Sequence, residues 1–261
     1  MFPKLISIGT FYVPTYGVLV ALGFLAGLSL TLRLAKKSGL DSEKVTNLAV
    51  YVALAGILGA KLLMIVFDWP DIRIFSIETL QAAGVFQGGL ILALVTAFFY
   101  IRKAQLPWLA TSDAFAPGVA LGHAIGKLGC FAAGCCWGKE CSRPWAVTFH
   151  NPEANGLTGV PIGIALHPAQ LYESGAEFLL TGLLVWRYGK AHQPGQIIGW
   201  YLVASSVLRF LIEFTRFHQQ ALPFGLPFSI TQWIAIALAV AGGIILLRPA
   251  PKAEPLVSRS V

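Results

Sequence analysis

The stretch TNLAVYVALAGILGAKLLMIVF, residues 46–67, decides the fold class of this chain. A helix needs roughly 20 apolar residues to cross the hydrocarbon core of a bilayer, and this stretch has that length with one charge, Lys61. Comparable runs occur at 16–35, 87–101, 170–187, 195–214 and 229–247. A seventh run, 114–132, is rich in Gly and Ala, and small residues let helices pack closely in lipid, so we expect it at the bundle centre. The sequence predicts an all-α integral membrane protein of about seven transmembrane helices with an extracytoplasmic loop region.

Composition favours a lipid-facing surface and argues against nucleic-acid binding. The 261 residues are 56% hydrophobic and 12% charged, with a mean hydropathy of +0.70. Soluble domains carry roughly a quarter of their residues as Asp, Glu, Lys and Arg, so this chain has too little charge to solvate a water-facing surface. The net charge of +7 comes from basic residues at the ends of apolar runs, where loops meet an anionic leaflet. We therefore expect no nucleic-acid partner.

The basic residues of the loops predict the orientation. They form two alternating sets, one of eleven residues and one of five. The larger set is Arg33, Lys36, Lys37, Lys44, Arg102, Lys103, Arg187, Lys190, Arg248, Lys252 and Arg259, and the smaller is Lys4, Arg73, Lys139, Arg143 and Arg216. Cytoplasmic loops carry the excess of Lys and Arg. We therefore expect a multi-pass protein of the inner (plasma) membrane, with its N-terminus outside and its C-terminus in the cytoplasm.

One membrane domain is expected over residues 1–248, followed by a flexible, Pro-rich cytoplasmic tail at 249–261. Within the domain, residues 133–167 form the longest loop, which this orientation places outside. The first apolar run is not a short one followed by a small-residue cleavage site, so no cleavable signal peptide is expected. Gly88 and Gly89 near the start of the third span are expected to bend or break that helix.

A few ionisable residues lie inside the apolar runs, where each costs several kcal/mol and usually faces the bundle interior or a wet cavity. Arg209 and Glu213 are spaced i, i+4 and share one helix face. They suit either a buried structural ion pair or a site for an anionic head group, because Arg binds phosphate in a planar fork. His123 and Lys127 share a face in the same way. A lone His is more often a hydrogen-bonded core residue than a catalyst.

Four cysteines, Cys130, Cys135, Cys136 and Cys141, are clustered in the sequence. Their spacing lacks the paired C-x-x-C knuckles of a zinc site, so metal binding ranks last and no metal ligand is expected. On an oxidising outer face, Cys136 and Cys141 are the favoured disulfide pair. Plain packing suits Cys130, which follows Gly129.

Seven segments, in this order, resemble the bacterial prolipoprotein diacylglyceryl transferase family. They are PTYGVLVALGFLAGL (14–28), GILGAKLLMIVFDWP (56–70), GVFQGGL (84–90), DAFAPGVALGHAIGKLGCFAAGCCWG (113–138), HPAQLYE (167–173), LRFLIEFTR (208–216) and SITQWIA (229–235). The resemblance implies transfer of a diacylglyceryl group from phosphatidylglycerol to the lipobox cysteine thiol of a preprolipoprotein, the first step of bacterial lipoprotein maturation. It implies no cofactor, and the thiolate would be the nucleophile.

The resemblance also implies roles for individual residues. Arg209 and Lys127 would bind the phosphate, Glu213 would position Arg209, and Tyr16 would orient the lipid. Further substrate contacts are implied at Gln87, Gly88, Gly89, Gly129, Gly138, His167, Gln170, Tyr172 and Glu173.

Departures from the family pattern leave two interpretations open. The family signature is close to GRxGNFxNxExxG, whereas residues 126–138 read GKLGCFAAGCCWG. Gln87 stands where the family commonly has His, and Gln cannot take the thiol proton, so His123 and Cys135 are the candidate substitutes. The chain is either a divergent but active transferase or a non-catalytic or altered-acceptor phospholipid-binding relative. A transporter is a weaker third hypothesis, because paired broken helices are not found.

Overall fold

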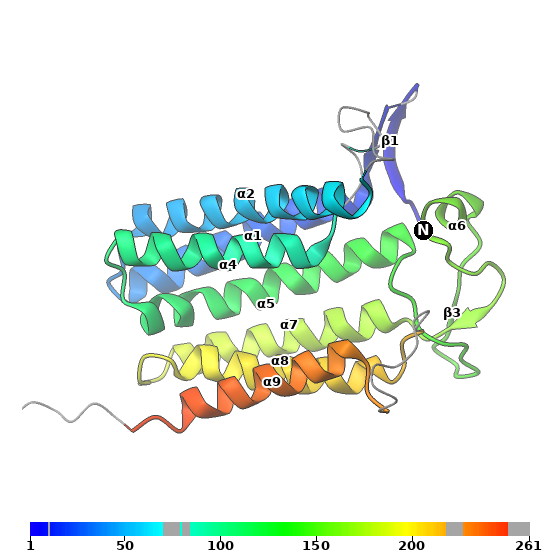
Figure 1. The fold of residues 1–261 in the computed structure, drawn as a ribbon. Helices are drawn as coiled ribbons and strands as arrows, with labels where there is room; N and C mark the ends of the chain where they lie inside the picture. Colours follow the sequence, from blue (N-terminus) through cyan, green and yellow to red (C-terminus); the bar gives the residue numbers. More distant parts are fainter. Residues whose placement is uncertain (10, 70–78, 80–83, 218–226, 250–261) are drawn as a thin grey trace, which may run out of the picture.

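The computed structural model describes residues 1–9, 11–69, 79, 84–217 and 227–249. Arg73 and nearly all of the expected tail at 249–261 therefore lie outside the described residues. Seven long helices run side by side in the described part of the chain (Figure 1). They are α1 (Thr15–Lys37), α2 (Ser42–Phe67), α4 (Phe86–Lys103), α5 (Trp108–Ala133), α7 (Ala169–Tyr188), α8 (Gln196–Glu213) and α9 (Ile230–Leu246).

Each long helix coincides with one predicted apolar run, so the prediction of a mainly helical protein is confirmed. Among the described helices, α1, α2, α4 and α8 are long and apolar enough to cross a membrane by length and composition, and α9 is a shorter apolar helix. Helices α5 and α7 carry more polar residues, and they bury them against each other and against α8.

The shorter elements gather at one end of the bundle (Figure 1). Strands β1 (Lys4–Ile8) and β2 (Phe11–Pro14) form an antiparallel hairpin ahead of α1, which the sequence analysis did not anticipate. The segment expected as a long loop contains β3 (Val147–Thr148), α6 (Pro152–Thr158) and β4 (Ala165–Leu166), with β3 and β4 antiparallel. Phe149, Ala154, Val160 and Leu166 form a small buried core within it. This segment is therefore a packed cap.

Helix α5 lies at the centre, against α1, α7 and α8. It begins at Trp108, six residues before the predicted run, and the added turns bury Asp113. The Asp113 carboxylate accepts hydrogen bonds from the backbone N–H groups of Gly195 (2.6 Å) and Ile198 (2.8 Å) at the start of α8. Carboxylates are stabilised at helix N-termini by the helix dipole. An acid that looked like a loop residue in the sequence thus joins two helices.

Helices α2 and α4 pack on each other through glycines. A Cβ atom on Gly89 would lie 2.7 Å from the carbonyl oxygen of Gly56, and Gly88 is in similarly close contact with the Gly59 carbonyl. Both Gly88 and Gly89 lie within the first turns of an intact α4. The expectation of a break in the helix was wrong, and these glycines serve close backbone packing.

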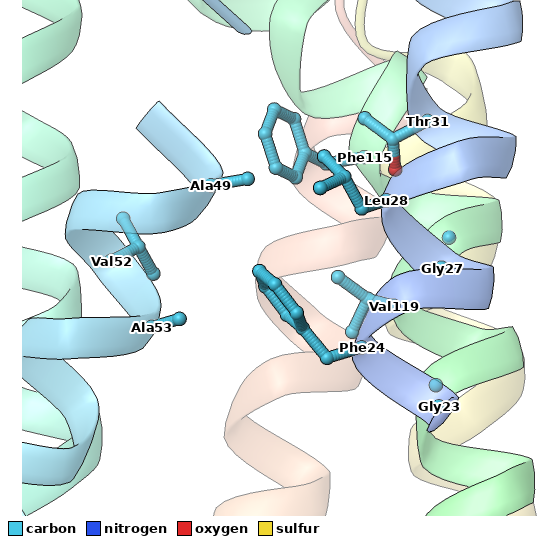
Figure 2. A pocket seen from close by; sticks show the side chains of 12 residues that line it. Gly23, Phe24, Gly27, Leu28, Thr31, Ala49, Val52, Ala53, Phe115 and Val119 are labelled. Atoms are coloured by element: carbon cyan, nitrogen blue, oxygen red, sulfur yellow. The ribbon is translucent and has the colours of Figure 1, made fainter. Parts of the chain in front are cut away.

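An apolar cavity of about 230 Å³ lies between α1, α2 and α5. Figure 2 shows Ala49 and Val52 of α2 across it from Phe24 and Leu28 of α1, with Phe115 contributed by α5. Its remaining lining residues are small or apolar apart from Thr31. The cavity is thus an apolar space between three helices.

Candidate active site

Glu173 is the centre of a cluster of charged side chains from α5, α7 and α8. Its carboxylate oxygen Oε2 lies 2.8 Å from Lys127 Nζ and 3.2 Å from Arg209 Nη1, and its Oε1 lies 3.2 Å from His123 Nε2. Helix α7 begins at Ala169, directly after its N-cap residue Pro168. Glu173 is thereby in the second turn, at the level of Lys127 on α5. Three residues singled out separately in the sequence therefore meet at one carboxylate.

His123 lies between two carboxylates. Its Nε2 faces Glu173, and its Nδ1 lies 3.3 Å from Oε1 of Glu177. Ser205 of α8 donates to the same Glu177 oxygen at 2.7 Å. A neutral imidazole has one N–H, so both histidine contacts are hydrogen bonds only when the ring is protonated. In that protonated state neither ring nitrogen can accept a thiol proton.

Glu213 extends the cluster toward the cap. Its carboxylate lies 2.9 Å from Arg209 Nη2, as the i, i+4 spacing predicts, and 3.8 Å from Arg216 Nε. Ser229, the N-cap of α9, donates a hydrogen bond to Glu213 Oε1 at 3.0 Å. Glu213 thus contacts Arg209 on its own helix and the N-cap of α9 at once.

The two central cations keep binding capacity. The side chains of Lys127 and Arg209 are 13% and 22% exposed, whereas those of Glu173 and Glu213 are 6% and 3% exposed. Arginine has five N–H donors and lysine three, and these carboxylates occupy only part of each set. The cluster can therefore accept one more anion without giving up its internal contacts.

The cap is held to α7 and α8 by backbone pairing around Gly138. Its N–H donates to the His167 carbonyl at 3.0 Å, and the next residue, Lys139, donates to the Thr215 carbonyl at 2.8 Å. A Cβ on Gly138 would lie about 2.5 to 2.6 Å from atoms of both partners. Gly138, expected at a substrate contact, is thus placed where only glycine fits between two backbones.

Three more predicted residues stabilise this junction. The Tyr172 hydroxyl receives a hydrogen bond from Trp145 Nε1 at 2.7 Å and lies 3.1 Å from His167 Nδ1. Gln170 is fully buried and donates to the Cys135 carbonyl at 2.7 Å. The element HPAQLYE therefore contributes Glu173 to the charged cluster and its other polar residues to the cap.

Tyr16 and Gly129 are in contact, whereas Gln87 lies on α4, away from them. A Cβ on Gly129 would lie 3.2 Å from the Tyr16 ring, so the first turn of α1 rests on the end of α5 at this glycine. Gln87 is exposed on the first turn of α4, whose main neighbour is α2. The structure thus places Gln87, Gly88 and Gly89 in the α2–α4 pair and not in the cluster around Glu173.

The expected disulfide between Cys136 and Cys141 is not formed, because all four cysteines are free. Cys141 is buried, and its sulfur accepts a hydrogen bond from the Arg143 N–H at 3.4 Å. The sulfur atoms of Cys130, Cys135 and Cys136 instead lie within 4.8 Å of one another. Hydrogen bonds from Cys130 and Cys135, together with the positive charge of Lys127, hold the pKa of the Cys136 thiol below its usual value.

Sequence reasoning missed Glu177, Ser205 and Ser229. Glu177 is spaced i, i+4 from Glu173, so its position on the same helix face was readable. The two serines had no such signal, because serine is common in apolar helices and at N-caps. Their roles depend on which helices are neighbours, which the sequence did not give.

Comparisons with known proteins identify the family of this chain. A family model described as prolipoprotein diacylglyceryl transferase matches residues 3–248. Among curated relatives, the phosphatidylglycerol–prolipoprotein diacylglyceryl transferase of Clostridium tetani is 36% identical over 77% of this chain and 80% of its own length. The proteins of the same name from Bordetella parapertussis and Finegoldia magna are 32% and 30% identical, over 95% and 89% of this chain and 96% and 90% of their own lengths. This chain belongs to the prolipoprotein diacylglyceryl transferase family.

Proposed function

We propose that this chain transfers a diacylglyceryl group from phosphatidylglycerol to the lipobox cysteine of a preprolipoprotein. In this reaction the sulfur bonds to the glyceryl carbon while that carbon's bond to the phosphate oxygen breaks. The products are a thioether and glycerol phosphate. The proton lost by the thiol is taken up by the released phosphate, unless another base retains it. The family match and the cluster around Glu173 support this proposal.

The observation that carries it is the charge of the cluster. With His123 protonated, four cationic groups, His123, Lys127, Arg209 and Arg216, face three carboxylates, Glu173, Glu177 and Glu213. One net positive charge remains, which matches the single negative charge of a phosphodiester. Arg209 and Lys127 would bind the phosphate and stabilise the charge that develops on it as the C–O bond breaks.

We also propose that all seven long helices cross the inner membrane, with the cap outside. Lys36, Lys37, Arg102, Lys103 and Arg187 end their helices at the end opposite the cap (Figure 1). The positive-inside rule assigns that end to the cytoplasm. The cluster then lies toward the outer leaflet, where a phospholipid head group and a signal-peptide cysteine would meet. The apolar cavity between α1, α2 and α5 is of a kind suited to an acyl chain.

The test is a transfer assay with purified full-length protein in detergent micelles. Phosphatidylglycerol labelled in its acyl chains and a synthetic lipobox peptide are the substrates, and the lipidated peptide is the product measured. We expect product with wild-type protein and none with a peptide whose cysteine is replaced by serine. Folded protein that forms no product, yet is stabilised against heat by phosphatidylglycerol, would support the alternative of a non-catalytic or altered-acceptor relative.

A further inference from the structure

The three sulfur atoms at the end of α5 are not among the groups that would bind the phosphate in the proposed transfer, and their arrangement is specific. Cys130 lies in the last turn of α5, and Gly134 ends the helix in the left-handed conformation, with φ of 80°. The N–H groups of Gly134 and Cys135 both return to the Cys130 carbonyl at 3.0 Å. This turn brings Cys135 back over Cys130.

Cys136 completes the group through an unusual backbone conformation. Its φ is 60°, and among the described residues Gln105 is the one other non-glycine residue with positive φ. Non-glycine residues in this region persist only where the surroundings hold them, and they gather at ligand clamps. The conformation of Cys136 places its sulfur beside the other two.

The loop that carries the cysteines is fixed by its neighbours. Gln170, fully buried, holds the Cys135 carbonyl, and Thr158 of α6 donates to the Gly134 carbonyl at 2.8 Å. These bonds join α5 to α7 and the cap. The sulfur atoms are therefore preorganised by groups that belong to other elements.

The spacing of the three sulfurs fits a metal ion. They lie within 4.8 Å of one another, and three thiolates each about 2.3 Å from one ion would be about 4 Å apart. Binding therefore needs a movement of less than about 1 Å. A purely sulfur donor set selects soft, thiophilic ions such as Cu(I) and Zn(II).

We propose that Cys130, Cys135 and Cys136 form a binding site for one thiophilic metal ion, Cu(I) or Zn(II), that ties the end of α5 to the cap. The spacing in the sequence did not indicate this site, because the turn at Gly134 and the positive φ of Cys136 create it. Cys141 is a natural control, since it is buried in the same cap without joining the three sulfurs.

The experiment uses full-length protein in detergent micelles, reduced, stripped of metal and desalted. Zn(II) and Cu(I) are added separately, and bound metal is measured by elemental analysis after a second desalting. Thiolate-to-metal charge-transfer absorption is followed with Cd(II) as the spectroscopic probe. We expect one ion per chain for wild type and for Cys141→Ser, with at least tenfold weaker binding for Cys135→Ser and Cys136→Ser. If the protein retains one of the two ions and not the other after desalting, the retained ion is the metal that this site prefers.

Metal uptake by wild type no greater than that of a Cys130→Ser/Cys135→Ser/Cys136→Ser variant would overturn the proposal, as would equal loss in Cys141→Ser and Cys135→Ser. Helical circular dichroism of every variant shows whether it is folded. Cys135 and Cys136 are only half-buried, whereas Cys130 is buried. Replacing either of the first two by serine should therefore disturb the fold less than replacing Cys130. The readout is metal content, so its failure leaves the proposed transferase activity untouched.

Discussion

Arg209 is the side chain on which the proposed reaction depends most directly. It reaches Glu173 and Glu213 at once, at 3.2 and 2.9 Å, and remains partly exposed. Arg209→Ala should lower the rate of transfer by roughly a hundredfold or more, the usual effect of removing one donor that stabilises developing charge. The micelle assay with labelled phosphatidylglycerol measures it.

The matched control is Arg187→Ala. Arg187 also bonds to neighbouring groups, Ala191 and Gln196, but it lies at the opposite end of the bundle. We expect it to keep wild-type activity. Equal rates for Arg209→Ala and wild type would remove Arg209 from the site.

Glu173 holds the cluster in place, so its charge matters for stability as well as activity. Glu173→Gln leaves Lys127, Arg209 and His123 without their shared carboxylate, and we expect the free energy of unfolding to fall by about 3–5 kcal/mol. Thermal unfolding in detergent checks this. Glu153→Gln breaks the more exposed pair with Lys4, which should cost at most about 1 kcal/mol. Equal shifts for the two variants would contradict a central role for Glu173.

Between helices, the α2–α4 contact is the most sensitive to added volume. Gly88→Ala places a methyl group against the Gly59 carbonyl, so the two helices must separate and the melting temperature should fall. Gly182→Ala in α7 adds the same methyl group where nothing lies within 4 Å. There, the better helix propensity of alanine should leave stability unchanged or raise it by up to about 1 kcal/mol. A loss in Gly182→Ala as large as that in Gly88→Ala would contradict this account.

The cavity between α1, α2 and α5 gives a prediction about lipid chains. Ala53 lines it from α2, and Ala53→Phe would fill part of its volume. If an acyl chain of the donor lies there, the variant should lose activity more with long-chain than with short-chain phosphatidylglycerol. Competition between the two lipids in one assay measures the ratio. An unchanged ratio with a folded variant would place the chains elsewhere.

The elements were predictable to different degrees. Apolar runs gave the seven helices, because the cost of exposing the backbone to lipid leaves the chain little choice. The early start of α5 was missed, since Asp113 reads as a loop residue until Gly195 and Ile198 are seen to bind it. The cysteine group was missed for a similar reason. Sulfur atoms five and six residues apart meet only after a left-handed turn at Gly134.

The site was predictable where helix periodicity applied. Arg209 with Glu213, and His123 with Lys127, were paired by their i, i+4 spacing. That Glu173 lies between these pairs depends on α7 packing beside α5 and α8. The resemblance placed Gln87 at the site, whereas the structure places it on the α2–α4 pair. No local pattern could separate these alternatives.

At the scale of the whole molecule, the orientation can be tested by labelling. In a variant without the four native cysteines, Gly156→Cys in α6 and Glu43→Cys at the start of α2 provide exposed thiols at opposite ends. A membrane-impermeant maleimide added to spheroplasts should label the first, and the second only after permeabilisation. The reverse pattern would invert the topology and place the cap in the cytoplasm.

The carboxylates of α7 have a consequence for how the protein is made. A charged side chain inside a spanning helix adds up to about 3 kcal/mol to the cost of insertion. Helix α7, which crosses the membrane in the proposed topology, carries Glu173 in its second turn and Glu177 near its middle. In the proposed topology α5 emerges first, so Lys127 and His123 would already be in the bilayer when α7 leaves the ribosome. Arg209 arrives later, with α8. We therefore expect the membrane integration of α7 to depend on α5, the long helix made before it. The order of the helices along the chain would thus help the charged residues of this site to enter the bilayer.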